Sequence, residues 1–295
     1  MQQKMSLGDK AFTVANYGFF ILAIFFCLYP FWYIFIYSLS EPMQAVRGVY
    51  FLPRGFTFQN YIDVFETPGI LRSAGISVLR TVSGTALTLV TCSFFAYLMT
   101  KEKMYFRKFI YRFTVITMYF NAGLIPWFLT MRAYGLNNNF FVYILPGAMS
   151  AFNIILIKTF VEQLPASLEE AAYIDGAGIF TVFSRIIIPL STPILATVAV
   201  FSAVSHWNSW FDNMIFMVGR PDLNTLQFML WNILNTAALQ ANSININVAE
   251  QLARQTSPES LRMTATMIVT FPILFVYPFA QRYFVKGIML GAVKG

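Results

Sequence analysis

The sequence predicts an all-α, polytopic membrane protein with six transmembrane helices. Of its 295 residues, 57% are hydrophobic and only 11% are charged, whereas a soluble domain carries about 25% charged residues. The apolar residues form continuous runs rather than alternating ones, which favours membrane-spanning helices over a transmembrane barrel. A chain of this composition needs the bilayer as its solvent, so membrane lipid is its first expected partner.

Six apolar segments are long enough to cross the membrane. A transmembrane helix needs about 20 mostly apolar residues, and the segments that qualify are 17–39, 74–99, 109–131, 139–160, 190–218 and 263–284. No small-residue cleavage site follows the first segment, so it is interpreted as a retained helix rather than a signal peptide. Residues 1–295 are therefore expected to form a single transmembrane domain.

The basic residues favour one orientation in the membrane, because cytoplasmic loops are enriched in Lys and Arg. With six spans, the N-terminal flank, the basic connection 101–112 and the C-terminal end share one side. All lysines then lie on that side: Lys4, Lys10, Lys101, Lys103, Lys108, Lys158, Lys286 and Lys294. We therefore expect both termini in the cytoplasm. The long segments 40–73 and 219–262 are then outer loops, the second with a helix around 223–240.

Several functions are disfavoured by what the sequence lacks. A single His, and two Cys that both lie in apolar runs, argue against a metal site or a His-based hydrolase. No paired carboxylates mark a catalytic centre, so no catalytic or metal-binding residue is predicted. The chain has no G-x-x-x-x-G-K-[ST] motif to hold ATP. The net charge of +7 is explained by membrane orientation, and nucleic acid is not an expected partner.

An acidic, glycine-containing segment interrupts the apolar chain at residues 162–189, on the expected cytoplasmic side. Ser167 followed by Glu170 has the spacing of a capping box, which predicts a short helix over 168–175 that ends at Gly176 and Gly178. A second amphipathic stretch then leads to Pro189. The segment is either an ordinary surface hairpin or a compact knob whose small residues let another protein approach closely.

The spacing within this segment resembles the EAA loop of ABC-importer permeases, which reads E-A-A, three residues, G, nine residues, I-x-L-P. Here Glu170 begins the E-A-A triplet, Gly176 follows after three residues, and the last four positions are residues 186–189 with Ile188 in place of Leu. That exchange keeps side-chain volume and hydrophobicity. "YFNAGLIPWFLTMRAYGLNNN", "LPASLEEAAYIDGAG" and "GIMLGAVKG" extend the resemblance to the maltose-type (MalG-like) carbohydrate permeases. The branch that takes up oligosaccharides and polysaccharides, alginate among them, is the most similar.

The resemblance implies a type I ABC-importer permease fold in the bacterial inner membrane. It also implies a second, non-identical permease, two ATP-binding subunits that hold ATP and Mg in place of this chain, and an extracytoplasmic sugar-binding protein. In such a permease the loop at 162–189 couples to the ATPase. The residues expected to do so here are Glu170, Ala171, Ala172, Asp175, Gly176, Gly178 and Pro189.

Polar and aromatic residues within the apolar runs are candidates for the substrate path, because they are costly against lipid and so tend to face a cavity. The candidates are Arg80, Asn121, His206, Trp207, Asn208, Trp210 and Asp212. Structural alternatives stay open: His206 and Asp212 can join helices, Arg80 can snorkel outward or pair with Asp212, and the tryptophans can belong to an interfacial belt.

The predicted function is that of a permease subunit of an ATP-driven importer for an oligosaccharide or polysaccharide, with acidic fragments of alginate or pectin as candidates. One alternative is an ABC permease for another small solute, such as a peptide, polyamine or phosphate ester. Another is a stand-alone ion-coupled carrier or membrane enzyme. The last class is disfavoured because repeated halves with broken helices are not evident in the sequence.

Overall fold

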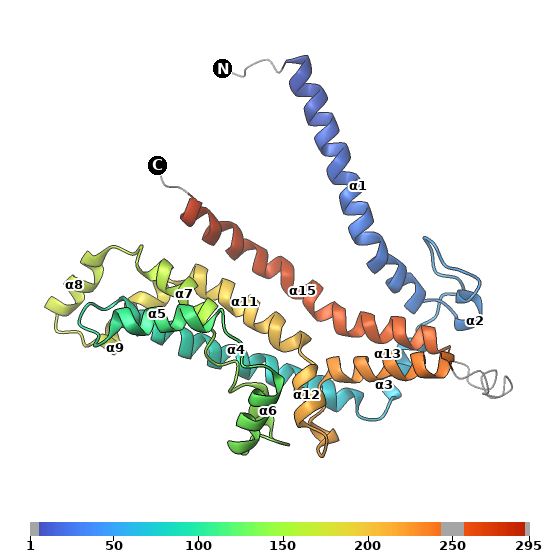
Figure 1. Cartoon of the computed structure of the whole chain (residues 1–295). Helices are drawn as coiled ribbons and strands as arrows, with labels where there is room; N and C mark the ends of the chain where they lie inside the picture. Colours follow the sequence, from blue (N-terminus) through green and yellow to red (C-terminus); the bar gives the residue numbers. More distant parts are fainter. Residues whose placement is uncertain (1–5, 243–256, 293–295) are drawn as a thin grey trace. The chain divides into compact units, whose positions relative to one another are not determined.

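The computed structural model describes residues 6–242 and 257–292, and its regular elements there are helical (Figure 1). The chain divides into two compact units. One consists of Met1–Pro68 with Asn232–Thr270, and the other of Gly69–Trp231 with Phe271–Gly295. The predicted all-α class is therefore confirmed. Lys4, Lys294 and residues 243–256 of the predicted outer loop lie outside the described residues.

The first unit is built on a long N-terminal helix. Its elements are α1 (Leu7–Ser38), α2 (Pro42–Ala45), α3 (Gln59–Glu66) and parts of α13 (Leu226–Asn242) and α15 (Pro258–Ala292). Asn60 of α3 donates to the carbonyl oxygens of Ser38 at 2.9 Å and Ser40 at 2.8 Å, which fixes α3 at the end of α1. Most of α1 exposes apolar side chains, from Phe12 to Trp32, as a helix in lipid does.

The second unit is built around α4 (Ile70–Thr100), which packs along α11 (Thr192–Asn208) and α7 (Ala151–Val161). The remaining elements are α5 (Arg107–Thr117), α6 (Leu124–Ala133), η1 (Phe140–Tyr143), α8 (Ala166–Ile174), α9 (Ile179–Val182), the π-helix η2 (Phe183–Ile187), α10 (Ile188–Leu190), α12 (Phe211–Phe216) and η3 (Pro221–Leu223). Cys92, Ile157, Val182 and Val198 belong to its largest apolar core.

A polar stripe runs along the buried face of α4. It consists of Ser73, Ser77, Arg80, Gly84 and Thr88, spaced three or four residues apart so that they share one helix face. The hydroxyl of Thr88 donates to the carbonyl of Gly147 at 3.3 Å. One turn on, Thr91 donates to the carbonyl of Ala148. Thr88 and Thr91 therefore satisfy backbone carbonyl groups of the irregular segment 144–150, which a lipid environment would leave unpaired.

The predicted count of six spans is not confirmed. Three helices in the described residues are long and apolar enough to cross a membrane: Gly8–Ser38, Ile70–Thr100 and Pro258–Val276. A fourth arises if Ile179–Leu190 and Thr192–Asn208, bent by 81°, count as one.

Three of the predicted segments are divided. Segment 190–218 is split between α11 and α12, with a break after Asn208. Segment 109–131 is split between α5 and α6, where Gly123 has φ 84° and donates its backbone N–H to the Asn121 side chain at 2.8 Å. Segment 139–160 is split between η1 and α7 around Pro146 and Gly147, neither of which favours a helix interior. Apolar composition alone did not reveal these breaks.

Gly84 should be the glycine of α4 that least tolerates a side chain. A Cβ there would lie 2.5 Å from Nε2 of His206, whereas a Cβ on Gly75 of the same helix would meet nothing within 4 Å. We expect Gly84→Ala to cost about 1–3 kcal/mol of stability through overpacking. Gly75→Ala should instead gain up to about 1 kcal/mol, because alanine is the better helix former. Thermal unfolding of the purified protein in detergent measures both. Equal midpoints for the two variants would contradict this packing.

Candidate functional site

The acidic segment folds as a helix, a tight turn and a second helix, named here the knob (residues 162–189). Its first helix, α8, ends at Ile174 with Asp175 as its C-cap residue, and Gly176 then adopts φ 79°. The Gly176 N–H donates to the Tyr173 carbonyl at 3.1 Å, and the Ala177 N–H donates to the Ala172 carbonyl at 2.9 Å. Because side-chain-bearing residues rarely adopt this left-handed conformation, Gly176 is what makes the turn possible.

The predicted cap at Ser167 is wrong. The helix α8 already begins at Ala166, and Pro165 occupies the N-cap position without a side-chain hydrogen bond to the first turn. A proline at this point suits a helix start, since its φ is fixed near the helical value and it lies where a backbone N–H has no intrahelical partner. Ser167 therefore lies inside the first turn.

The second arm of the knob runs through α9, the π-helix η2 and α10. The π-helix ends at Ile187, two residues before Pro189, whose ring and missing N–H disturb regular α-helical hydrogen bonding. Ser191 then separates this arm from α11, at the 81° bend. Pro189 thus lies where the knob joins the long helix.

The small residues of the knob have two different roles. Ala172 and Ala177 pack against the chain's own core, which includes Val182 and Phe183. Ala171, Gly176 and Gly178 are exposed, so they are the small residues that leave room for another molecule. The alanine pair of the motif therefore has one residue facing inward and one facing outward.

The exposed tip of the knob combines carboxylates with large apolar side chains. Glu170 and Asp175 are exposed, and beside them Ile174 is 86% and Phe180 is 67% exposed. The sequence analysis missed the last two residues. Their signal was an apolar side chain on each side of the Asp-Gly-Ala-Gly turn, where a loop facing only water would carry polar residues.

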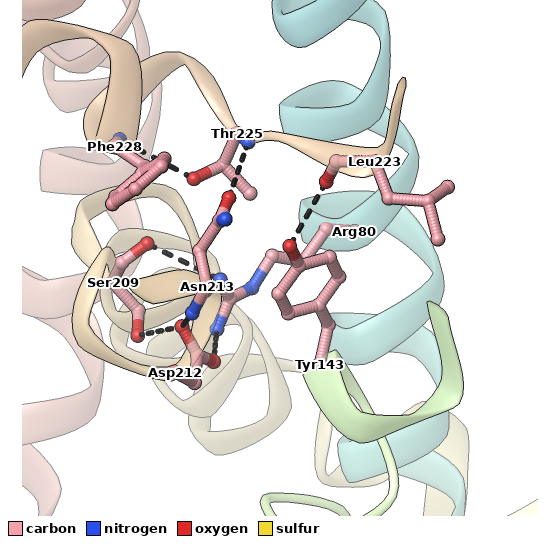
Figure 2. A network of polar contacts seen from close by, with 8 residues as sticks. All are labelled: Arg80, Tyr143, Ser209, Asp212, Asn213, Leu223, Thr225 and Phe228. Atoms are coloured by element: carbon pink, nitrogen blue, oxygen red, sulfur yellow. Dashed lines mark hydrogen bonds and ion pairs between the residues drawn. The ribbon is translucent and has the colours of Figure 1, made fainter. Parts of the chain in front are cut away.

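A second polar site is centred on Arg80 of α4 (Figure 2). Its guanidinium forms a two-pronged ion pair with Asp212 of α12, one bond of which, from Nη1 to Oδ1, is 3.1 Å long. Nη1 also donates to the Ser209 carbonyl at 3.2 Å. Arg80 is 3% and Asp212 is 9% exposed. Of the alternatives left open for Arg80, the pair with Asp212 is the one that forms.

Neighbouring residues complete this network. The ring of Tyr143 lies 4.6 Å below the Arg80 guanidinium, and its hydroxyl donates to the Leu223 carbonyl at 2.9 Å. The Asn213 side chain accepts a hydrogen bond from the Thr225 backbone N–H at 2.6 Å. Tyr143, Asn213 and Thr225 are all buried. None of the three was predicted. Tyr143 and Thr225 come from other segments of the chain than Asp212, whereas Asn213 directly follows Asp212 in α12 (Figure 2).

The other predicted path residues lie at different distances from the pair. His206 packs against Gly84, one turn of α4 from Arg80. At the break between α11 and α12, Asn208 is exposed, and the half-buried Trp210 ring stacks on Trp231 with centroids 5.1 Å apart. Trp207 is half-buried in the last turn of α11. Asn121 instead forms the turn between α5 and α6.

Breaking the buried pair should cost more than replacing it whole. Removing one partner of a buried ion pair leaves an uncompensated charge and typically costs about 3–5 kcal/mol, whereas replacing both by apolar residues is often close to neutral. We therefore expect Arg80→Met and Asp212→Leu each to lower the unfolding midpoint strongly, and the double variant to recover most of the loss. Thermal unfolding in detergent gives the full cycle. Additive losses would contradict a direct pair.

Comparisons with known proteins agree with this architecture. The polygalacturonan/rhamnogalacturonan transport system permease protein YtcP of Bacillus subtilis is 32% identical over 291 residues, covering 98% of this chain and 100% of that protein. Protein LplC of the same organism is 36% identical over 290 residues, covering 98% and 96%. A crystal structure of a bacterial ABC transporter involved in the import of the acidic polysaccharide alginate contains a chain that matches with a TM-score of 0.85 and 31% identity. That match covers 96% of this chain and 100% of the other.

Residues 90–290 match the family described as the binding-protein-dependent transport system inner membrane component. The match spans the knob, α11 and the segment that holds Asp212. Such a component carries out transport rather than enzymatic chemistry, and the type of system implies ATPase and binding-protein partners. The chain therefore belongs to the family of inner-membrane permease components of binding-protein-dependent ABC importers.

Proposed function

We propose that the protein is one of two non-identical permeases of a bacterial importer that brings an acidic oligosaccharide or polysaccharide into the cytoplasm. Two relatives support this cargo: one is named for polygalacturonan and rhamnogalacturonan transport, and the other belongs to an importer of alginate. The similarity covers 96–98% of this chain, so it includes the segments around Asp212 as well as the knob. The two ATP-binding subunits and the extracytoplasmic sugar-binding protein complete the complex.

The knob at 162–189 is proposed as the coupling loop that docks on an ATP-binding subunit. The observation that carries this proposal is its tip, where Ile174 and Phe180 are exposed beside the carboxylates of Glu170 and Asp175. Large exposed apolar side chains grouped in this way mark an interaction surface. An exposed ion pair adds only about 0–1 kcal/mol, so the shape set by Gly176 should matter more than the charge of Glu170.

The orientation proposed for the chain places the knob and both termini in the cytoplasm, and segment 219–262 outside. The support is the distribution of basic residues: Lys101 and Lys158 lie next to the knob, as the positive-inside rule requires. In this orientation the single permease domain, residues 1–295, presents α12 and the Arg80–Asp212 network toward the outer side.

For the cargo path, we propose a division of labour among the predicted residues. Arg80 and Asp212 neutralise each other, so they hold the bend at Ser209–Trp210 in place. Asn208 and Trp210, at that bend, then supply hydrogen-bonding and aromatic contacts to a sugar. His206 and Trp207 support them from the last turn of α11, and Asn121 contributes from the turn at 121–123.

The first experiment concerns the cargo. Proteoliposomes that contain the chain with its partner permease and ATPase are given binding protein together with uronate or neutral oligosaccharides. We expect uronate oligosaccharides to stimulate ATP hydrolysis and neutral ones to have no effect. Stimulation by neutral sugars alone would reject an acidic cargo. No stimulation with any saccharide would reject saccharide import.

The second experiment concerns the knob, with a control matched in backbone conformation. Gly176 and Gly135 both have positive φ, 79° and 70°, and a Cβ on either would meet nothing within 4 Å. Aspartate in the left-handed region costs about 1–2 kcal/mol at either position. Gly176→Asp should nevertheless lower stimulated ATP hydrolysis by about tenfold or more, equivalent to 1.4 kcal/mol or more, and Gly135→Asp should not. If both variants match the unmodified complex, the knob has no coupling role.

A further inference from the structure

One ion pair joins the knob to the end of α4. Lys101, the C-cap residue of α4, forms it with Glu169 of α8. The two side chains are only 18% and 20% exposed, so the pair is more shielded from water and salt than an ordinary surface pair. Glu169 directly precedes the E-A-A triplet, and nothing in the sequence pattern indicated that it faces inward.

Tyr97 strengthens the same junction. The Nζ of Lys101 lies 4.0 Å from the centroid of the Tyr97 ring, a cation–π distance. The Tyr97 hydroxyl lies 3.4 Å from the hydroxyl of Tyr173 on α8, and the Tyr97 ring packs on Phe183 with centroids 5.4 Å apart. Tyr97 is fully buried. One side chain of α4 therefore contacts both arms of the knob.

A second group of ion pairs nearby has a different character. Glu162 pairs with both Lys158, at 2.7 Å, and Arg107, at 3.6 Å. Because Glu162 has two cationic partners and is itself exposed, the loss of one partner leaves the other in place. These pairs attach the start of the knob to α5 and α7 rather than to α4.

The helix α4 connects this junction to the Arg80–Asp212 network. Arg80 and Lys101 are 21 positions apart in one uninterrupted helix with no internal proline, a distance of about 32 Å at 1.5 Å per residue. A displacement of α8 that pulls on Lys101 and Tyr97 would therefore move α4 along its length. Arg80 would pass that displacement to Asp212 and the bend at Ser209.

We propose that Lys101, Glu169, Tyr97 and Tyr173, named here the α4–α8 strut, transmit movement of the knob to α4. The strut positions the knob and contacts neither ATP nor cargo. This inference rests on the proposed coupling role of the knob. It goes further by identifying Lys101 and Glu169 as the residues that transmit the movement of the knob to α4.

The test uses charge exchange in the reconstituted importer. The single variants are Lys101→Glu and Glu169→Lys, the exchange variant carries both, and the control is Lys103→Glu, which makes the same charge change at an exposed position of the same connection. The readouts are co-purification with the ATP-binding subunits, basal ATP hydrolysis, and hydrolysis stimulated by loaded binding protein. A role limited to folding would lower all three readouts together.

We expect each single variant to assemble with normal basal hydrolysis but with stimulation lowered about tenfold, and the exchange variant to recover most of it. Lys103→Glu should behave as the unmodified complex. The proposal is overturned if the single variants match Lys103→Glu, or if the exchange variant assembles without recovery.

A second set of variants covers the case in which charge reversal prevents insertion. Lys101→Met and Glu169→Gln keep the side-chain size and remove one charge each. If the two changes act through one contact, the double variant should be no worse than either single one. Independent, multiplying losses of stimulation would overturn the strut.

Failure of the strut is distinguishable from failure of the proposed function. If the unmodified complex shows no stimulated hydrolysis with any saccharide, both proposals fall. If it is stimulated, and Gly176→Asp abolishes stimulation while the Lys101 and Glu169 variants do not, the knob couples by another route and only the strut is rejected.

Discussion

The ion pair between Arg80 and Asp212 is the interaction on which the second unit depends. A charged side chain among apolar helices is expensive unless it is paired and hydrogen-bonded. Here the pair joins α4 to α12, and the Ser209 carbonyl accepts a further bond from the guanidinium. The chain can therefore break its helix after Asn208 without leaving the carbonyl of Ser209 unsatisfied. The position of Trp210 follows from that break.

The same constraint explains the rest of the α4 stripe. In lipid, the hydrophobic effect does little to press one helix against another, so close packing and interhelical hydrogen bonds decide which faces meet. Gly84 lets His206 approach the helix backbone. Thr88 and Thr91 accommodate the irregular segment around Gly147 through its carbonyl groups. The polar face of α4 thus holds the interrupted helices and the irregular segment through hydrogen bonds and close packing.

At the other end of α4, apolar packing holds the knob in place. Its inner side is fixed by Ala172, Ala177 and Tyr97, all packed in the chain's own core. Its tip remains free to present Ile174 and Phe180. A knob that is rigid inside and apolar outside suits the transmission of force from an ATP-binding subunit, because packed interiors deform little. The proposed coupling to the ATP-binding subunit therefore requires no flexible hinge within the knob itself.

The sequence by itself determined the fold class, the family and the turn of the knob. These depend on local properties: apolar run length, the E-A-A spacing, and a glycine at the one turn position with φ 79°. Tertiary structure decided which polar residues meet. Arg80 and Asp212 are 132 positions apart, and Glu169 and Glu170 are adjacent in sequence, yet one is held by Lys101 while the other is exposed. The number of spans predicted from apolar composition also missed the helix breaks at Asn121 and Gly147. Hydropathy measures the cost of exposing a segment to water, but not whether another helix supplies the hydrogen bonds that let it break.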